Sequence, residues 1–219
     1  MDRHATLARI LDGGVIAVVR LRSGDQLLRV AKAVDAGGIR AIEFTLTTPG
    51  ALEAIAAASA AMGEGVVLGA GSVLDGASAR SAILAGARFI VAPTLSRDTI
   101  EVCHRYGAVV IPGAYTPTEM LTAAEWGADL VKVFPATQLG PRYFRDVLAP
   151  LPQLRLVPTG GVDLETAGAF ISAGAAAVAV GSNLVDQQLI LAGDYGVLTD
   201  RARAFRAVID EARAGIAGR

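Results

Sequence analysis

Residues 126–135, Trp-Gly-Ala-Asp-Leu-Val-Lys-Val-Phe-Pro, contain the transition that decides the fold of this chain. A helical run ends at Trp126, Gly127 follows it, and a short apolar run from Leu130 to Phe134 comes next. Glycine after a helical run is typical of a helix C-terminus, because glycine adopts a left-handed backbone without strain. A short apolar run bounded by glycine and proline indicates a buried strand. The stretch therefore predicts a helix-to-strand turn of an α/β protein.

The same alternation extends in both directions over almost the whole chain. Eight βα units in a row predict a parallel sheet with helices outside it, and burial of both sheet faces explains why the strands lack polar alternation. The predicted strands are Val15–Arg20, Ala41–Leu46, Val66–Gly71, Phe89–Ala92, Val109–Pro112, Leu130–Phe134, Leu154–Pro158 and Ala176–Val180. The predicted helices are Ser23–Ala36, Pro49–Met62, Asp75–Ala85, Ser96–Tyr106, Pro117–Trp126, Pro141–Ala149, Asp163–Ala173 and Thr199–Ala214, with a possible extra helix over Asp2–Leu11.

The repeat predicts a (β/α)8 TIM barrel that forms a single domain over residues 1–219. No Pro/Ser-rich linker divides the chain. A chain of this length can bury roughly 70% of its unfolded surface and needs no covalent cross-link. An open, doubly wound sheet is the alternative, because the number of strands alone does not show closure.

Composition excludes several classes of partner. The formal net charge is −1, which gives no reason to expect nucleic acid. No apolar run approaches the ~20 residues that span a bilayer, and the first residues lack the apolar core of a signal peptide. Cys103 is the single cysteine, and the two histidines, His4 and His104, lie away from the predicted strand ends, which argues against a zinc site. We expect a soluble, cytoplasmic protein that binds small molecules, not membranes or nucleic acid.

Lysine occurs at only two positions, although Lys and Arg together number 20. Lys32 lies in an amphipathic helical run, whereas Lys132 lies between two valines in a strand that should be buried. An unpaired ammonium group is costly there. Lysine can lose its proton and arginine cannot, so a reactive amine would explain the choice. The alternative is a lysine on an edge strand that extends to water.

Glu43 is a carboxylate among apolar neighbours in the second predicted strand. Strands two and six face each other across an eight-stranded barrel and share interior layers, so Glu43 and Lys132 could exchange protons. The alternative is a structural ion pair, although such pairs stabilise weakly. Barrels hold their active sites at the carboxyl ends of the strands. The other polar residues at those ends are Arg20, Thr45, Thr47, Ser72, Thr94, Thr159 and Ser182.

Glycine-rich loops follow the seventh and eighth predicted strands. Gly160 and Gly161 lead directly into one predicted helix, and another helix is expected to begin at Gly181 and Ser182. Glycine lets backbone N–H groups approach an anion closely, and a helix N-terminus adds a favourable dipole. Because barrels often bind phosphate at these two loops, the sequence predicts a phosphate site there.

With Lys132, Glu43 and the glycine loops in place, the chain resembles the 2-keto-3-deoxy-6-phosphogluconate (KDPG/KHG) aldolase family. The resemblance covers nearly the whole chain. The motifs that carry it are Gly37-Gly38, Ile42–Leu46, Gly69–Leu74, Ile111–Gly113, Thr116–Glu119, Val131–Pro135, Pro158–Val162 and Val180–Ser182.

The resemblance implies a class I (Schiff-base) aldolase that cleaves 2-dehydro-3-deoxy-6-phosphogluconate to pyruvate and glyceraldehyde 3-phosphate. It implies a homotrimer without metal or organic cofactor. Lys132 would form the imine and Glu43 would transfer protons. The resemblance also implies that Thr159 orients the substrate with Phe134 and Pro93 packed against it. Phosphate would be held by Gly160, Gly161, Gly181 and Ser182.

Some positions depart from the family pattern. Thr47 stands where some members carry an arginine that meets the pyruvate carboxylate, so we expect Arg20 to make that contact. Ser72 replaces a common threonine and keeps its hydroxyl. Residues Leu139–Tyr143 resemble the phosphogalactonate aldolases, which leaves the C4 epimer open.

Other functions fit the same residues. An aldolase for 2-dehydro-3-deoxy-6-phosphogalactonate or 4-hydroxy-2-oxoglutarate would use the same imine. A phosphosugar isomerase or epimerase on the same barrel would use acid–base chemistry without a covalent lysine. A barrel that only binds phosphorylated metabolites would form no adduct.

Overall fold

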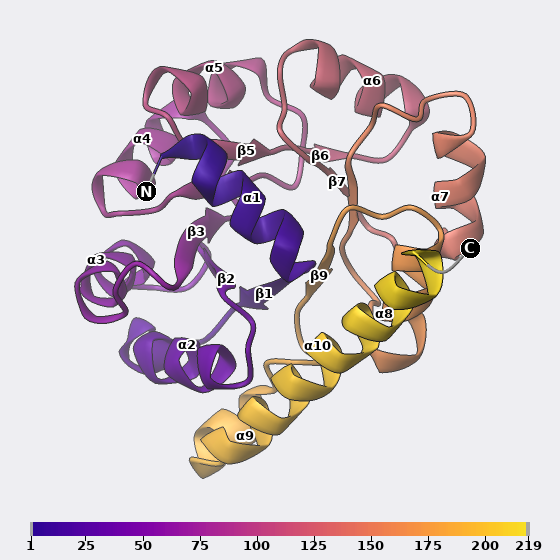
Figure 1. Cartoon of the computed structure of the whole chain (residues 1–219). Coiled ribbons are helices and arrows are strands. Elements are labelled where there is room, and N and C mark those ends of the chain that lie inside the picture. Colours follow the sequence, from indigo (N-terminus) through magenta and orange to yellow (C-terminus); the bar gives the residue numbers. More distant parts are fainter. Residues whose placement is uncertain (1, 218–219) are drawn as a thin grey trace.

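The computed structural model describes residues 2–217, and its strands form two parallel sheets arranged around a common centre (Figure 1). The first sheet has the order β5-β4-β3-β2-β1-β9 and the second has the order β6-β7-β8. The strands are β1 (Val15–Val19), β2 (Ala41–Thr45), β3 (Val67–Gly71), β4 (Phe89–Val91), β5 (Val109–Ile111), β6 (Gly113–Ala114), β7 (Val131–Val133), β8 (Leu156–Pro158) and β9 (Val178–Val180).

The strand order follows the chain order, and the first strand pairs with the last. β1 pairs in parallel with β2 on one side and with β9 on the other. A doubly wound sheet reverses its order at a switch point, so the open-sheet alternative does not fit. Contacts also join the two sheets. The Lys132 N–H donates to the carbonyl of Pro112 at 2.9 Å, and Thr159 forms an isolated parallel bridge with Ala179.

The predicted fifth strand, Val109–Pro112, corresponds to β5, and the two-residue strand β6 that follows it was not predicted. Pro112 lies between them and has no N–H to donate to a ladder. All eight predicted strands are otherwise present, with ends that are generally shorter than predicted. Strand ends shift by one or two residues between criteria, so these differences do not move the predicted site.

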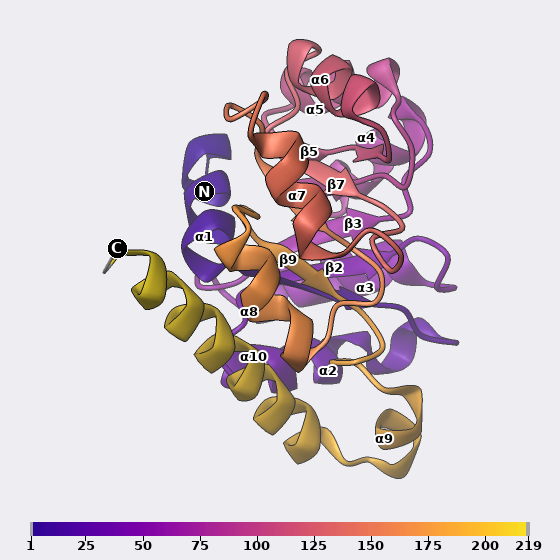
Figure 2. The same ribbon diagram turned by 90° about the vertical axis from the view of Figure 1, so that its right-hand side faces the viewer.

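The helices other than α1 surround the strands, and α1 lies across one end of them (Figure 1). The long helix α10 packs along α8 and α2 (Figure 2). The helices are α1 (Arg3–Gly13), the 3₁₀ helix η1 (Gly24–Gln26), α2 (Leu27–Ala36), α3 (Ala51–Ala61), α4 (Gly76–Leu84), α5 (Arg97–Arg105), α6 (Pro117–Glu125), α7 (Gly140–Leu148), α8 (Leu164–Ser172), α9 (Gln187–Ala192) and α10 (Tyr195–Ala217). In the described residues, no helix is both long enough and apolar enough to cross a bilayer.

Two helical predictions need correction. The predicted final helix Thr199–Ala214 is too short, because α10 already begins at Tyr195 and continues to Ala217. A helix was expected after Gly181 and Ser182, but none of the predicted helix ranges covers α9. Helix α9 has six residues, and the left-handed Gly193 ends it just before α10 begins, so its apolar pattern is too short to be distinguished from a loop.

Helix α1 covers one end of the two sheets (Figure 1). Asp2 caps it by accepting the N–H of Ala5, and Gly14 ends it in a left-handed conformation. Ile10 is fully buried and packs in the interior cluster with Ala41 of β2 and Phe89 of β4. The predicted extra helix over Asp2–Leu11 is therefore confirmed, shifted by one or two residues.

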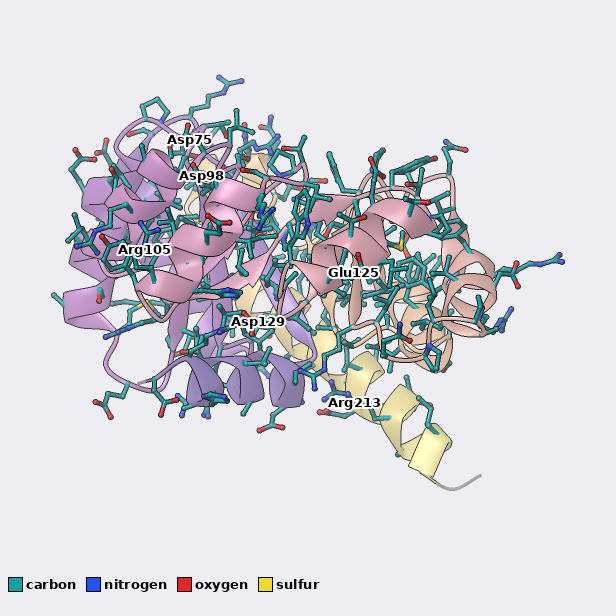
Figure 3. The ribbon with its side chains drawn as sticks, turned by 90° about the horizontal axis from the view of Figure 1, so that it is seen from above. Asp75, Asp98, Arg105, Glu125, Asp129 and Arg213 are labelled. Atoms are coloured by element: carbon teal, nitrogen blue, oxygen red, sulfur yellow. The ribbon has the colours of Figure 1, made fainter. Side chains whose placement is uncertain are left out.

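The opposite end of the two sheets carries the carboxyl ends of the strands and the amino ends of the following helices. Asp75 caps α4, and Asp98 in the first turn of α5 accepts the N–H of Gly76 at 2.8 Å. Figure 3 shows Asp75 and Asp98 near the upper edge of the molecule, while Asp129, just before β7, lies lower and towards α1. The loops at the Asp75 end are where the sequence predicts the site.

Candidate active site

Lys132 is buried in the middle strand of the three-stranded sheet. β7 pairs with β6 on one side and β8 on the other, and the Lys132 side chain is only 6% exposed. Val131 and Val133 belong to the outer core between strands and helices, so the alternating side chain of Lys132 points to the interior. Its Nζ lies 4.8 Å from the centre of the Phe134 ring. The interpretation as a solvent-facing lysine on an edge strand is wrong.

Glu43 is buried on β2 and is 1% exposed. Its Oε2 has no hydrogen-bond partner among the described residues. The carboxyl group fits because the neighbouring strand β3 has glycine at position 71, where an added Cβ would overlap Oε1 and lie 2.7 Å from Cγ. A buried carboxyl group without a partner is costly, so it is a candidate for function.

The two groups influence each other's protonation without forming a close ion pair. Neither belongs to an ion pair within 4 Å in the part of the chain that the structure describes. Burial raises the pKa of the Glu43 carboxyl, and the charges of Lys132 and Arg20 partly oppose this. Burial lowers the pKa of the Lys132 amine; the charge of Glu43 opposes the shift and that of Arg20 adds to it. Both groups are thereby biased towards their neutral forms.

A cavity of about 540 Å³ lies above these two side chains. It is lined by all of the predicted site residues except Thr47. These are Lys132, Glu43, Arg20, Ser72, Pro93, Phe134, Thr159, Gly160, Gly161, Gly181 and Ser182. The structure therefore brings together side chains from β2 and β7 with loops that follow β1, β3, β4, β8 and β9.

Thr47 is the one predicted site residue that lies outside the cavity. It is exposed in the turn between β2 and α3, and its hydroxyl donates to Thr45 Oγ1 at 3.2 Å. Thr45 is itself fully buried, with its hydroxyl 3.4 Å from the carbonyl of Val19. The two threonines brace the end of β2 against β1. Arg20, at the end of β1, does reach the cavity.

The two glycine loops form one wall of the cavity. Gly160 and Gly161 have positive φ values of 93° and 73°, and a Cβ at Gly161 would lie 3.0 Å from Thr137 Oγ1. At Gly181 an added Cβ would meet nothing within 4 Å, so the backbone there faces open space. Thr159 Oγ1 is buried without a hydrogen-bond partner among the described residues. A polar hydroxyl and exposed backbone in one wall suit an oxygen-rich ligand.

Several cavity residues that follow Ser182 were not predicted from the sequence. Asn183, Asp186 and Gln187 also line the cavity. Asp186 caps α9 and pairs with Arg201 at 3.6 Å, and Gln187 Nε2 donates to the carbonyl of Arg20 at 3.4 Å. A helix-capping aspartate six residues after the end of β9 was a signal for α9, but α9 was not recognised.

The histidines and the cysteine lie elsewhere. His104 contacts Arg3 and the carbonyl of Gly127 below the strands, and Cys103 is fully buried, with its pKa raised to about 12 mainly by burial. Within residues 2–217 no three His, Cys, Asp or Glu side chains group as metal ligands would.

The residues that line the cavity lie in the part of the chain that matches known proteins. The family model for KDPG and KHG aldolase matches residues 7–200. The 2-dehydro-3-deoxy-phosphogluconate aldolase of Treponema pallidum (strain Nichols) is 38% identical over 186 residues, which cover 84% of this chain and 88% of that protein. The 2-dehydro-3-deoxy-6-phosphogalactonate aldolase of Escherichia coli (strain K12) is 34% identical over 171 residues, covering 78% and 83%.

A solved structure of a KDPG aldolase is also similar to this chain in its fold. The KDPG aldolase from Legionella pneumophila, described with pyruvate captured at low pH as a covalent carbinolamine intermediate, is 26% identical to this chain. It aligns with a TM-score of 0.84 over 91% of this chain and 97% of its own.

Proposed function

The chain belongs to the KDPG and KHG aldolase family, and we propose that it cleaves 2-dehydro-3-deoxy-6-phosphogluconate to pyruvate and glyceraldehyde 3-phosphate. It is a lyase of the class I aldolase type. The observation that supports the assignment of roles is the buried amine of Lys132 and the buried carboxyl of Glu43 in one cavity with two glycine loops.

The first step is attack of the neutral Lys132 amine on the C2 ketone of the substrate. The carbinolamine hydroxyl takes up a proton and leaves as water, which gives an iminium ion that can accept the electron pair of a breaking C–C bond. The lowered pKa of Lys132 increases the fraction of amine that is unprotonated and able to attack. Removing the amine by Lys132→Ala should lower kcat at least ~10³-fold.

The second step is C3–C4 cleavage, with Glu43 as the proton acceptor. Glu43 removes the proton of the C4 hydroxyl directly or through water; the C4 carbonyl forms, and the C3–C4 electron pair moves into the iminium. The products are glyceraldehyde 3-phosphate and an enamine of pyruvate. Glu43 then returns a proton to C3, and water hydrolyses the imine to free Lys132 and pyruvate. A buried carboxyl without a fixed partner is free to gain and lose a proton in this way.

Two charged ends of the substrate have candidate binding groups. Arg20 lines the cavity and carries the positive charge that the C1 carboxylate requires. The phosphate would be held by the backbone at Gly160, Gly161, Gly181 and Ser182. Thr159 would orient the carbon chain of the substrate between its carboxylate and its phosphate. Phe134 and Pro93 would exclude water from the reacting carbons, and the Ser72 hydroxyl is a further polar group in the cavity lining.

Trapping with borohydride tests the proposal. Incubation with pyruvate and borohydride should add one reduced pyruvyl group to Lys132, mapped by mass spectrometry. Lys32, the other lysine, is exposed on α2, so Lys32→Arg is the matched control and should keep both adduct and activity. A protein that turns over substrate without an adduct on Lys132 would be an acid–base isomerase or epimerase, and the aldolase proposal would be wrong.

The phosphogalactonate epimer is the second candidate substrate. A relative of that name matches this chain with an identity only slightly lower than that of the phosphogluconate relative. Pyruvate release from the two epimers and from 4-hydroxy-2-oxoglutarate, compared as kcat/KM, decides between them. Preference for the unphosphorylated compound would contradict the proposed phosphate site.

We also propose the finer architecture that the resemblance implies. The strands would form one closed (β/α)8 barrel in a single domain, with β5 and β6 as two parts of one strand. Support comes from the Lys132–Pro112 hydrogen bond on one side and from the Thr159–Ala179 bridge on the other. The homotrimer implied by the resemblance and the cytoplasmic location expected from composition stay predictions.

A further inference from the structure

The two glycine loops belong to different βα units, and one side chain joins them. Asn183 Nδ2 donates a hydrogen bond of 2.8 Å to the carbonyl oxygen of Val162. Val162 ends the loop that follows β8 (160–162, the β8 loop), and Asn183 ends the run that follows β9 (181–183, the β9 loop). Both residues line the cavity.

Each loop is held on its own side by local contacts. Val162 is 2% exposed, and the following Asp163 caps α8 by accepting the N–H of Thr166. On the other side, the N–H of Val185 donates to the carbonyl of Gly181 at 2.8 Å, and Val185 is buried. The Asn183–Val162 bond therefore links two turns that are separately fixed, so its effect is on the spacing between them.

We propose that Asn183 is a positioning residue that sets this spacing, so that backbone N–H groups of both loops reach one phosphate group. The inference rests on the proposed phosphate-binding role of the loops. Hydrogen bonds weaken steeply beyond about 3.2 Å, so a small separation of the loops weakens several contacts to the same phosphate together. Asn183 acts through the carbonyl of Val162 and not by contact with the reacting carbons.

The variant Asn183→Leu tests the inference, because leucine has nearly the size of asparagine and no donor. We expect KM for the phosphorylated substrate to rise about 5- to 10-fold, the effect of losing one hydrogen bond, with kcat changed less than about twofold. KM for 4-hydroxy-2-oxoglutarate, which has no phosphate, should stay at the parent value. The inhibition constant of inorganic phosphate should rise by the same factor as KM for the phosphorylated substrate.

Gln188→Leu is the matched control. Gln188 is exposed on α9, does not line the cavity, and would lose an amide of the same kind five residues away. It should keep both KM values. The inference is overturned if Asn183→Leu keeps the parent KM for the phosphorylated substrate, or if it raises both KM values equally. Failure of the proposed function reads differently: the parent protein itself then shows no adduct on Lys132 or no preference for phosphorylated substrates.

Discussion

Gly71 has no side chain, and the carboxyl group of Glu43 occupies the space that a Cβ at this position would take. Gly69, two residues earlier on β3, leaves room in the same way for the ring of Phe89. Strand β3 thus contributes no side chains at these positions of the interior, and its neighbours fill the space. The positions of Glu43 and Phe89 therefore depend on residues that carry no functional group themselves.

Gly71→Ala should displace the Glu43 carboxyl and leave Lys132 in place. We expect kcat to fall about 10²-fold, the loss typical of a misplaced general base, while pyruvate and borohydride still label Lys132. Gly65→Ala is the control, because a Cβ there meets nothing within 4 Å. A Gly71→Ala protein with parental kcat would show that the Glu43 carboxyl is not the proton acceptor.

The charge of Arg20 should be visible in the pH dependence of imine formation. Only the deprotonated amine attacks, so the rate of adduct formation with pyruvate rises as pH rises through the pKa of Lys132. Arg20 lowers that pKa and Glu43 raises it. Arg20→Gln should therefore move the midpoint to higher pH, and Glu43→Gln should move it to lower pH.

The measurement is the initial rate of trapped adduct against pH for each variant. Arg22→Gln removes an exposed arginine two residues from Arg20 that does not line the cavity, and it should leave the midpoint unchanged. A midpoint that moves equally in Arg22→Gln would assign the effect to net charge and not to Arg20.

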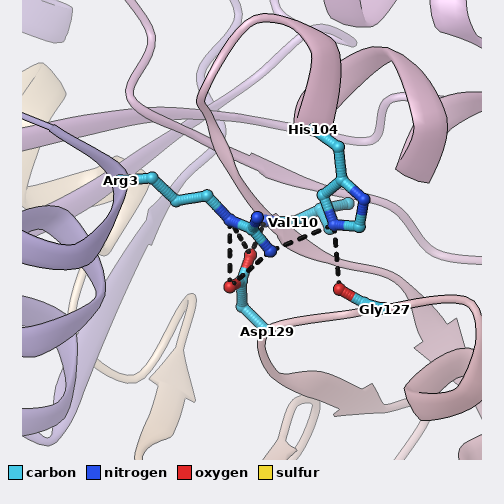
Figure 4. A network of polar contacts seen from close by, with 5 residues as sticks. All are labelled: Arg3, His104, Val110, Gly127 and Asp129. Carbon is cyan, nitrogen blue, oxygen red and sulfur yellow. Dashed lines mark hydrogen bonds and ion pairs between the residues drawn. The ribbon is translucent and has the colours of Figure 1, made fainter.

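At the scale of elements, one polar network ties helix α1 to the strand that carries Lys132 (Figure 4). Arg3 donates from Nε and its terminal nitrogen to the Asp129 carboxylate at 2.8–3.1 Å. The same carboxylate accepts the N–H of Val110 at 2.9 Å. Asp129 lies two residues before β7, so this network anchors α1, the start of β7 and β5 to one another.

Arg3→Ala should leave a nearly buried carboxylate without its cationic partner. We expect a loss of about 1–3 kcal/mol in the free energy of unfolding, measured by urea denaturation, with kcat nearly unchanged. The exposed pair Arg97–Glu101 has a similar N–O distance of 2.9 Å, and Arg97→Ala should cost less than about 0.5 kcal/mol. Equal losses in the two variants would mean that the Asp129 network contributes no more than a surface pair.

At the scale of the whole molecule, the resemblance to the aldolase family predicts a homotrimer. Sedimentation equilibrium should then give a mass about three times the 22.4 kDa of the chain, independent of pyruvate. In such a trimer, each chain would bury apolar surface against both of its neighbours around a threefold axis. The assembly would then be closed and have no open ends. A single species at the mass of one chain, with full activity, would contradict it.

The local sequence pattern determined the order of elements and identified Lys132 and Glu43 as candidate site residues. The glycines after helices mark turns that the structure has, and Gly127 shows why: its φ is 91°, and an added Cβ would lie 2.6 Å from His104. A lysine between valines and a glutamate among apolar residues were recognisable because burial of such groups is costly wherever the strands lie. These predictions required only the residues that are adjacent in the sequence.

Only the tertiary structure decided which residues from separate units meet. Thr47 and Arg20 both follow strands, yet only Arg20 reaches the cavity, because the Thr47 hydroxyl turns to Thr45. The space that Gly71 leaves for Glu43, and the bond from Asn183 to Val162, join different βα units of the fold. Such contacts depend on strand register and loop approach, which the folded chain sets and a local pattern does not encode.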